Sequence, residues 1–81
     1  MEKQEILTKI TAIISDETGI SKEEIRADSA LMDELDLSSL EILIMIGKME
    51  QEFSVRLNPS ELQEIVTVQE LAEMIQASMK R

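Results

Sequence analysis

The chain has 81 residues, with 17 acidic and 8 basic side chains and a formal net charge of −9 at pH 7. This length suits one small domain over residues 1–81, and the charge argues against nucleic acid or an anionic membrane as a partner. Cysteine and histidine are absent, which excludes a disulfide or a structural zinc site, and no apolar run is long enough for a membrane span. The N-terminus does not resemble a secretory signal, so we expect a cytoplasmic protein. We also expect a monomer, and the acidic charge predicts partners with basic surfaces.

The first predicted element is an amphipathic helix over residues 2–17. Its isoleucine and leucine side chains recur at spacings of three and four residues, which is typical of a helix with one buried face. Gly19 follows and predicts a left-handed helix end. A long connection over residues 20–37 comes next, and Ser21 with Glu24 predicts one short turn within it. A loop this long in a small domain often leads to a functional site.

The segment from Leu35 to Phe53 is predicted to contain the central helix. Ser38 can accept a hydrogen bond from the first turn, and Glu41 can accept one from the amide of Ser38, which together form a capping box. Ser39 then takes the first helical position. One stripe of this helix is apolar and is predicted to face the core: Ile42, Met45, Ile46, Met49 and Phe53.

Leu40 and Ile44 point roughly away from this stripe, with Leu43 on the flank. Exposed aliphatic side chains beside a serine, at the positive end of a helix, predict a docking surface. No basic residue lies between Ala27 and Lys48, whereas this window contains Asp28, Asp33, Glu34, Asp36 and Glu41. The alternatives are that the helix is buried on all sides or that the two serines are only caps. Local chemistry favours neither the docking surface nor these alternatives.

After Phe53 the chain alternates polar and apolar residues over 54–57. Four residues without a partner strand predict an extended connector and not a sheet. Asn58 and Pro59 then predict the start of a short helix that ends near Glu64.

Thr67 and Glu70 repeat the capping pattern before the last helix. Its apolar stripe is formed by Val68, Leu71, Ala72, Ile75 and Met79. The expected fold is all-α, a small four-helix bundle with three main helices, one short helix and a long first loop. Six methionines and a single aromatic residue predict an interior that repacks easily.

These residues also resemble a known family. In acyl carrier and peptidyl carrier proteins, a serine in an Asp-Ser-Leu motif begins a helix that ends in Phe fourteen residues later. Here Ser39 precedes Leu40 and stands fourteen residues before Phe53. The likeness extends from the turn at Gly19 and Ile20 to the TVQELAEMI tail. It implies a single carrier domain of the acyl-carrier type, with Ser39 as the attachment site of phosphopantetheine from coenzyme A.

The resemblance also implies partners and residue roles. The partners are a phosphopantetheinyl transferase, an acyl- or aminoacyl-loading enzyme, and downstream synthases of fatty-acid, polyketide or peptide-type biosynthesis with basic docking patches. Partner recognition is expected at Asp36, Leu40, Glu41, Leu43 and Ile44. The acyl pocket is expected at Ile42, Ile46, Met49 and Phe53. Two positions depart from the family pattern: Ser38 replaces the usual Asp, and Ile44 stands where fatty-acid carriers commonly have Glu, which indicates a more apolar partner.

Catalysis by this chain is not expected, because it has no histidine, no cysteine and no glycine-rich phosphate loop. No metal site is expected either, since the acidic segment lacks the glycine and glutamate of a calcium loop. The leading hypothesis is a carrier that holds a thioester on phosphopantetheine at Ser39. The alternative is an interaction module that uses Leu40, Leu43 and Ile44 to hold a partner while Ser39 stays unmodified. The sequence does not distinguish among fatty acyl, polyketide, aminoacyl and D-alanyl cargo.

Overall fold

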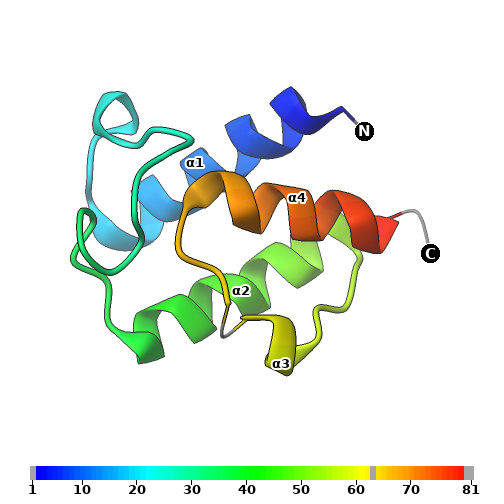
Figure 1. Cartoon of the computed structure of the whole chain (residues 1–81). Helices are drawn as coiled ribbons and strands as arrows, with labels where there is room; N and C mark the ends of the chain where they lie inside the picture. The colour runs from blue at the N-terminus through cyan, green and yellow to red at the C-terminus, as the bar shows by residue number, and fades with distance from the viewer. Residues whose placement is uncertain (1, 63, 80–81) are drawn as a thin grey trace.

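Four α-helices and one short 3₁₀-helix follow one another in the computed structural model, which describes residues 2–62 and 64–79 (Figure 1). The α-helices are α1 (Lys3–Thr18), α2 (Ser39–Phe53), α3 (Pro59–Leu62) and α4 (Val68–Met79), and the 3₁₀-helix η1 is Lys22–Glu24. No strand occurs in the described ranges. The expected all-α architecture of three main helices and one short helix is confirmed.

The core lies between the three long helices. α1 packs against α4 and α2, as Figure 1 shows from the side on which α4 crosses in front of α1. α1 contributes Ile6, Ile10 and Ile14, which are fully buried at a spacing of four residues. The predicted stripes of α2 and α4 also face inward, except that Ile42 and Met79 are only half-buried.

Local signals set the helix ends largely as predicted. Gly19 has φ 79° and its N–H donates to the Ser15 carbonyl at 2.9 Å, which is the left-handed end that a glycine allows. The capping box before α4 is formed, with the Thr67 N–H donating to Glu70 Oε1 at 3.0 Å and the Glu70 N–H to Thr67 Oγ1 at 3.2 Å. Since these contacts are local, short sequence patterns are sufficient to predict them.

Two local predictions need correction. Ser21 Oγ accepts from the Glu23 N–H at 3.4 Å and not from Glu24, whose N–H donates instead to the Ser21 carbonyl at 2.9 Å. The reason is that η1 is a 3₁₀ turn, which closes over fewer residues than an α-helical capping box. The short helix α3 ends at Leu62 instead of near Glu64, which lies in a turn, and the intervening Gln63 lies outside the described residues.

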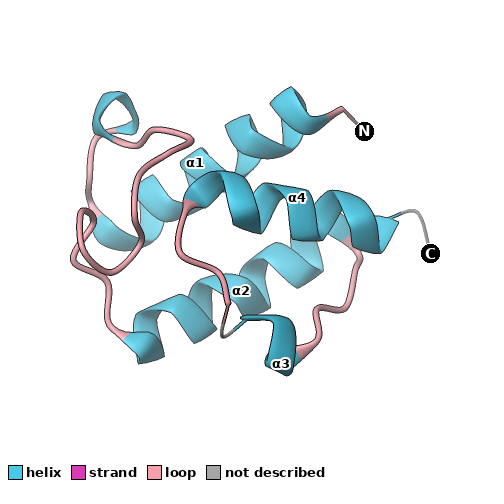
Figure 2. Cartoon of the chain, in the orientation of Figure 1, coloured by secondary structure: helices cyan, strands magenta, loops and turns pink. Residues whose placement is uncertain are grey.

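The long connection over residues 20–37 pairs through backbone hydrogen bonds with the segment between α3 and α4 (Figure 2). Ala30 and Thr67 form an isolated antiparallel bridge, and three backbone hydrogen bonds flank it. They run from the Leu31 N–H to the Val66 carbonyl at 2.8 Å, from the Val68 N–H to the Ser29 carbonyl at 3.2 Å, and from the Gln69 N–H to the Ala27 carbonyl at 2.8 Å. This pairing joins segments more than thirty residues apart, and the sequence pattern did not predict it.

Candidate functional site

The start of α2 is held by a reciprocal pair of hydrogen bonds. The Glu41 N–H donates to Ser38 Oγ at 3.2 Å, and the Ser38 N–H donates to Glu41 Oε1 at 3.1 Å. The predicted capping box is therefore confirmed. Because Ser38 is the cap, the next residue, Ser39, takes the first position of the helix.

Ser39 is exposed, and its hydroxyl has no hydrogen-bond partner in the described part of the chain. The backbone amides of Ser39 and Leu40 have no acceptor there either, because the capping serine uses the amide of Glu41. The first amides of a helix point toward its positive end and favour an anionic group there. A phosphate attached to Ser39 Oγ would lie close to these two N–H groups.

The chain reaches Ser38 through a left-handed residue. Asp36 has φ 55° and is exposed, while Leu35 and Leu37 on either side of it are buried. The Leu37 N–H donates to the Leu31 carbonyl at 3.1 Å, which closes this part of the loop on itself. The start of α2 is therefore held on both sides, by its cap and by two leucine anchors in the core.

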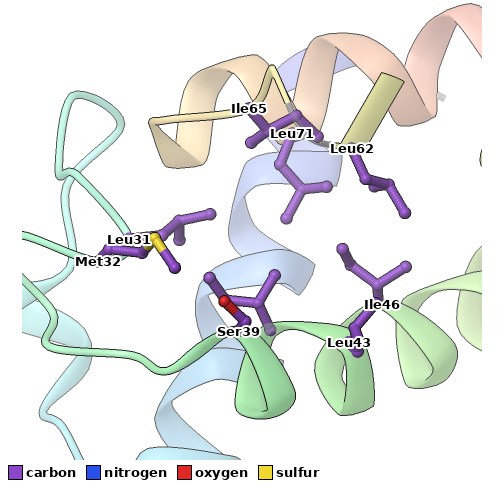
Figure 3. A pocket seen from close by; sticks show the side chains of 9 residues that line it. Leu31, Met32, Ser39, Leu43, Ile46, Leu62, Ile65 and Leu71 are labelled. Atoms are coloured by element: carbon purple, nitrogen blue, oxygen red, sulfur yellow. The ribbon is translucent and has the colours of Figure 1, made fainter. Parts of the chain in front are cut away.

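A pocket of about 460 Å³ opens beside Ser39. Figure 3 shows the Ser39 hydroxyl at the edge of this space, with Leu31 and Met32 of the loop on one side and Leu62, Ile65 and Leu71 across from α2. The lining comes from the loop, α2, α3, the α3–α4 connector and α4, and apart from Ser39 it is apolar: Leu31, Met32, Ile42, Leu43, Ile46, Leu62, Ile65 and Leu71.

The pocket differs in part from the one expected from sequence. Ile42 and Ile46 line it, whereas Met49 and Phe53 are buried in the core and are not among its lining residues. The role of these four residues in holding an acyl chain stays a prediction. The expected pocket was the inward stripe of α2 without Met45, whereas only the N-terminal part of that stripe lines the gap toward α3 and α4. The walls that sequence reasoning missed depend on how the loop and the α3–α4 connector pair, and we know of no local signal for that pairing.

The side chains expected to recognise partners are on the surface. Leu40, Leu43 and Ile44 are exposed by 67%, 59% and 50% of their areas, and Asp36 and Glu41 are exposed as well. The alternative that α2 is buried on all sides is therefore wrong. Their role in docking stays a prediction.

The surroundings of this surface are acidic. Asp33, Glu34 and Asp36 are exposed in the loop that leads to α2. Lys48, the first basic residue after them, is paired with Glu17 of α1. Within residues 2–62 and 64–79 there is no group of three or more acidic side chains placed to hold a metal ion.

A family model described as "Phosphopantetheine attachment site" matches residues 8–75, from the first half of α1 into α4. The chain belongs to this family. Phosphopantetheine, held covalently, is therefore its cofactor, and the chain is a carrier and not an enzyme.

Relatives of this carrier are similar over most of their length. An acyl carrier protein of Cyanidium caldarium is 34% identical over 73 residues, which are 90% of this chain and 85% of the relative. One of Beutenbergia cavernae is 33% identical over 66 residues, 82% of this chain and 80% of the relative. The solved structure of the acyl carrier protein from Enterococcus faecalis superposes with a TM-score of 0.79, covering 96% of this chain and 99% of that one. Because the sequence identity is only 23%, this structural similarity supports the fold alone.

The residues around Ser39 suit the group that the family carries. The exposed hydroxyl can form the phosphodiester, and the two amides next to it have no acceptor within residues 2–62 and 64–79. When bound, phosphopantetheine supplies a terminal thiol on a flexible arm. The chain has no thiol of its own, because it contains no cysteine. The apolar pocket beside Ser39 lies within the reach of such an arm.

Proposed function

We propose that this chain is an acyl carrier protein whose phosphopantetheine arm is attached to Ser39. The observation that carries the proposal is that a free serine hydroxyl at the start of α2 stands at the edge of an apolar pocket of about 460 Å³. The names of the relatives, all acyl carrier proteins, support it. In this role the chain presents a thioester-bound intermediate to enzymes of fatty-acid or polyketide biosynthesis.

The attachment uses the two features described above. The Ser39 oxygen forms a phosphodiester with the phosphopantetheine of coenzyme A, and the nucleotide part of coenzyme A leaves. A phosphopantetheinyl transferase catalyses this step. The new negative charge lies at the positive end of α2, where the amides of Ser39 and Leu40 can donate to its oxygens.

The pocket favours an acyl cargo over an aminoacyl one. Its walls are aliphatic apart from Met32 and Ser39, so a hydrocarbon chain can leave water there while a polar amino group would lose hydrogen bonds. Each methylene that moves from water into such a site contributes about 0.8 kcal/mol. A flexible arm then offers the cargo at high effective concentration to whichever enzyme is docked.

Docking is expected on the exposed part of α2. Leu40, Leu43 and Ile44 supply apolar contact area, and the surrounding carboxylates favour partners with basic patches. Ile44 adds apolar area where the family resemblance leads us to expect a charge, which favours a partner with an apolar side chain opposite it. No helix in the described ranges has the length and apolarity needed to cross a bilayer.

The intact mass of the chain after co-expression with a phosphopantetheinyl transferase of broad carrier specificity tests the attachment. We expect the wild type to gain the mass of one phosphopantetheinyl group and Ser39→Ala to gain none. Modification of Ser39→Ala would move the site to Ser38.

An unmodified wild type would favour the second candidate function, an interaction module without a prosthetic group. The observation behind this alternative is that Ser38 is a neutral cap and leaves no carboxylate directly before Ser39 for the transferase to recognise. The same mass measurement therefore separates the two functions.

A further inference from the structure

Met32 is the most exposed methionine of the described chain. It is exposed by 51% of its area, whereas Met45 and Met49 are buried in the core and Met74 and Met79 are half-buried. Because an oxidant must touch the sulfur atom, exposure decides which methionine reacts first. Met32 is therefore the described methionine most open to oxidation.

Met32 also lines the apolar pocket beside Ser39. Figure 3 shows its side chain on the loop side of the pocket, next to Leu31 and on the side where Ser39 lies. The other side chains that line the pocket are aliphatic apart from Ser39, and an aliphatic group does not react with mild oxidants. Met32 is therefore the lining side chain that an oxidant can change from apolar to polar.

The backbone around Met32 is held by hydrogen bonds. The Leu31 N–H donates to the Val66 carbonyl at 2.8 Å. The Glu34 N–H donates to the Ala30 carbonyl at 3.0 Å, and the Ala30 N–H donates to Glu34 Oε1 at 3.2 Å. The loop therefore keeps residue 32 at the pocket. A more polar side chain there either stays in the wall or turns to water and leaves a gap in the wall.

The charges near Met32 indicate the class of oxidant. Asp33, Glu34 and Asp36 are exposed on the same loop, and none of them belongs to an ion pair within the described ranges. Their negative field repels anionic oxidants and does not act on an uncharged hydroperoxide.

We propose that Met32 is a reversible oxidation site that controls whether the pocket shelters an acyl chain. A lone pair of the Met32 sulfur attacks the terminal oxygen of a hydroperoxide, the O–O bond breaks, and the hydroxyl proton passes to the leaving alkoxide. The products are the sulfoxide and an alcohol, or water when the oxidant is hydrogen peroxide. The sulfur loses two electrons and the peroxide gains two. The inference rests on the proposed function, because it concerns cargo attached to Ser39.

Oxidation of Met32 makes one wall of the pocket strongly polar. A sulfoxide oxygen accepts hydrogen bonds, and the one hydroxyl among the lining side chains, that of Ser39, is consumed by the phosphodiester. An acyl chain that covers the sulfoxide therefore removes it from water without offering a donor in return, which costs free energy. The oxidised pocket should hold the chain less tightly than the reduced one.

Peroxide treatment of the unmodified chain tests which methionine reacts. The chain has no cysteine, so before the arm is attached hydrogen peroxide meets no thiol. Peptide mass mapping should show that Met32 gains an oxygen before the buried Met45 and Met49 do. Equal or faster oxidation of Met45 or Met49 would overturn the proposal.

The effect on cargo is measured after the peroxide is removed. A phosphopantetheinyl transferase then loads oxidised and untreated chains with octanoyl-phosphopantetheine from octanoyl-coenzyme A, or with the bare arm from coenzyme A. The octanoyl gain is the melting temperature of the octanoyl form minus that of the bare-arm form of the same chain, so a general loss of stability on oxidation cancels. Oxidation should reduce this gain by about 4 °C or more. Methionine sulfoxide reductases A and B, which act on the two sulfoxide epimers, should restore it.

Two substitutions of Met32 separate polarity from other effects of peroxide. Met32→Leu keeps an aliphatic wall, so peroxide should leave its octanoyl gain unchanged. Met32→Gln introduces a polar group without any oxidant and should reduce the gain as oxidation does. The control is Val66→Gln, which makes a similar change at a side chain that is 55% exposed but does not line the pocket, and it should keep the gain.

The outcomes separate this inference from the proposed function. A wild type that takes up no octanoyl-phosphopantetheine would refute both. A loaded wild type with the same octanoyl gain before and after oxidation of Met32 would refute this inference alone. So would a Met32→Leu variant that loses its gain on peroxide treatment, or an untreated wild type without any gain, because the pocket would then shelter no cargo.

Discussion

Ser38 and Ser39 are adjacent but have different environments. The hydroxyl of Ser38 is engaged in the capping box, while that of Ser39 has no hydrogen-bond partner among the described residues and lies at the edge of the pocket. Both facts follow from the positions of the two residues at the start of α2. The side chain of the N-cap residue accepts a hydrogen bond from a first-turn amide, whereas the side chain of the first helical residue does not. Sequence reasoning predicted this division correctly, because capping depends on residues within one turn.

We expect Ser38→Ala to destabilise the chain by about 1 kcal/mol, because the Glu41 amide then loses its acceptor. Attachment of phosphopantetheine should slow but persist. Urea unfolding and the rate of mass gain measure the two effects. Ser38→Asp serves as the control, since aspartate also caps a helix and should restore stability. Complete loss of modification in Ser38→Ala would show that Ser38 does more than cap the helix.

At the scale of the elements, α1 is joined to both other long helices by exposed ion pairs. Lys3 pairs with Glu73 of α4 at 2.9 Å, and Lys9 pairs with Glu52 of α2 at 3.6 Å. The hydrogen bond and the charge of Lys3 hold the pKa of Glu73 below its ordinary value of 4.5. Because the pKa is lowered in the folded state, the stabilisation from this pair is present at neutral pH and is lost as the pH falls through the folded pKa.

Lys3→Met should therefore raise the pKa of Glu73 toward its ordinary value. A pH titration of the Glu73 carboxyl by NMR measures it. Lys9→Met is the matched control, because it removes a cation of α1 that pairs with Glu52 and should leave the pKa of Glu73 where it is. An equal change in both variants would indicate a general charge effect and not the Lys3–Glu73 pair.

The exposed face of α2 predicts how partners associate with this carrier. Acidic side chains act at a distance and are screened beyond about 8 Å at physiological salt, while apolar contacts act only on touching and respond little to salt. Association with the transferase should therefore slow as salt rises, and Ile44→Asp should speed dissociation. Stopped-flow or surface-binding kinetics measure both rates.

The control for Ile44→Asp is Ala77→Asp, which adds the same charge to an exposed position of α4. It should leave dissociation unchanged. If the association rate did not depend on salt and the Ile44→Asp variant dissociated like the wild type, this face would not be the docking surface.

At the scale of the whole molecule, the pocket is a product of the tertiary arrangement. Its walls come from the loop, α2, α3, the α3–α4 connector and α4, and the loop is held to that connector by backbone hydrogen bonds. The core beside it contains buried methionines, which repack at low cost. We therefore expect a guest chain to enter between α2 and the segments opposite without disrupting the isoleucines of α1.

A medium-length acyl cargo should stabilise the carrier. We expect an octanoyl form to melt at a higher temperature than the form with only the bare arm, because its methylenes leave water in the pocket at about 0.8 kcal/mol each before the cost of parting the helices. An alanyl form has little apolar area to bury and should melt like the bare arm. Calorimetry of the three forms provides the comparison, and equal melting temperatures would rule out this pocket as a shelter for the cargo.

The sequence by itself determined the three long helices, the caps of α2 and α4, most of the inward stripes and the position of Ser39, because each depends on residues within one or two turns of one another. It also carried the family resemblance, since the order and spacing of those local signals are what the family shares. Only the tertiary structure decided which part of the α2 stripe lines the pocket, leaving Met49 and Phe53 in the core. The physical reason is that the pocket depends on backbone pairing between Ala30 and Thr67, and backbone groups carry no residue code that a sequence could reveal.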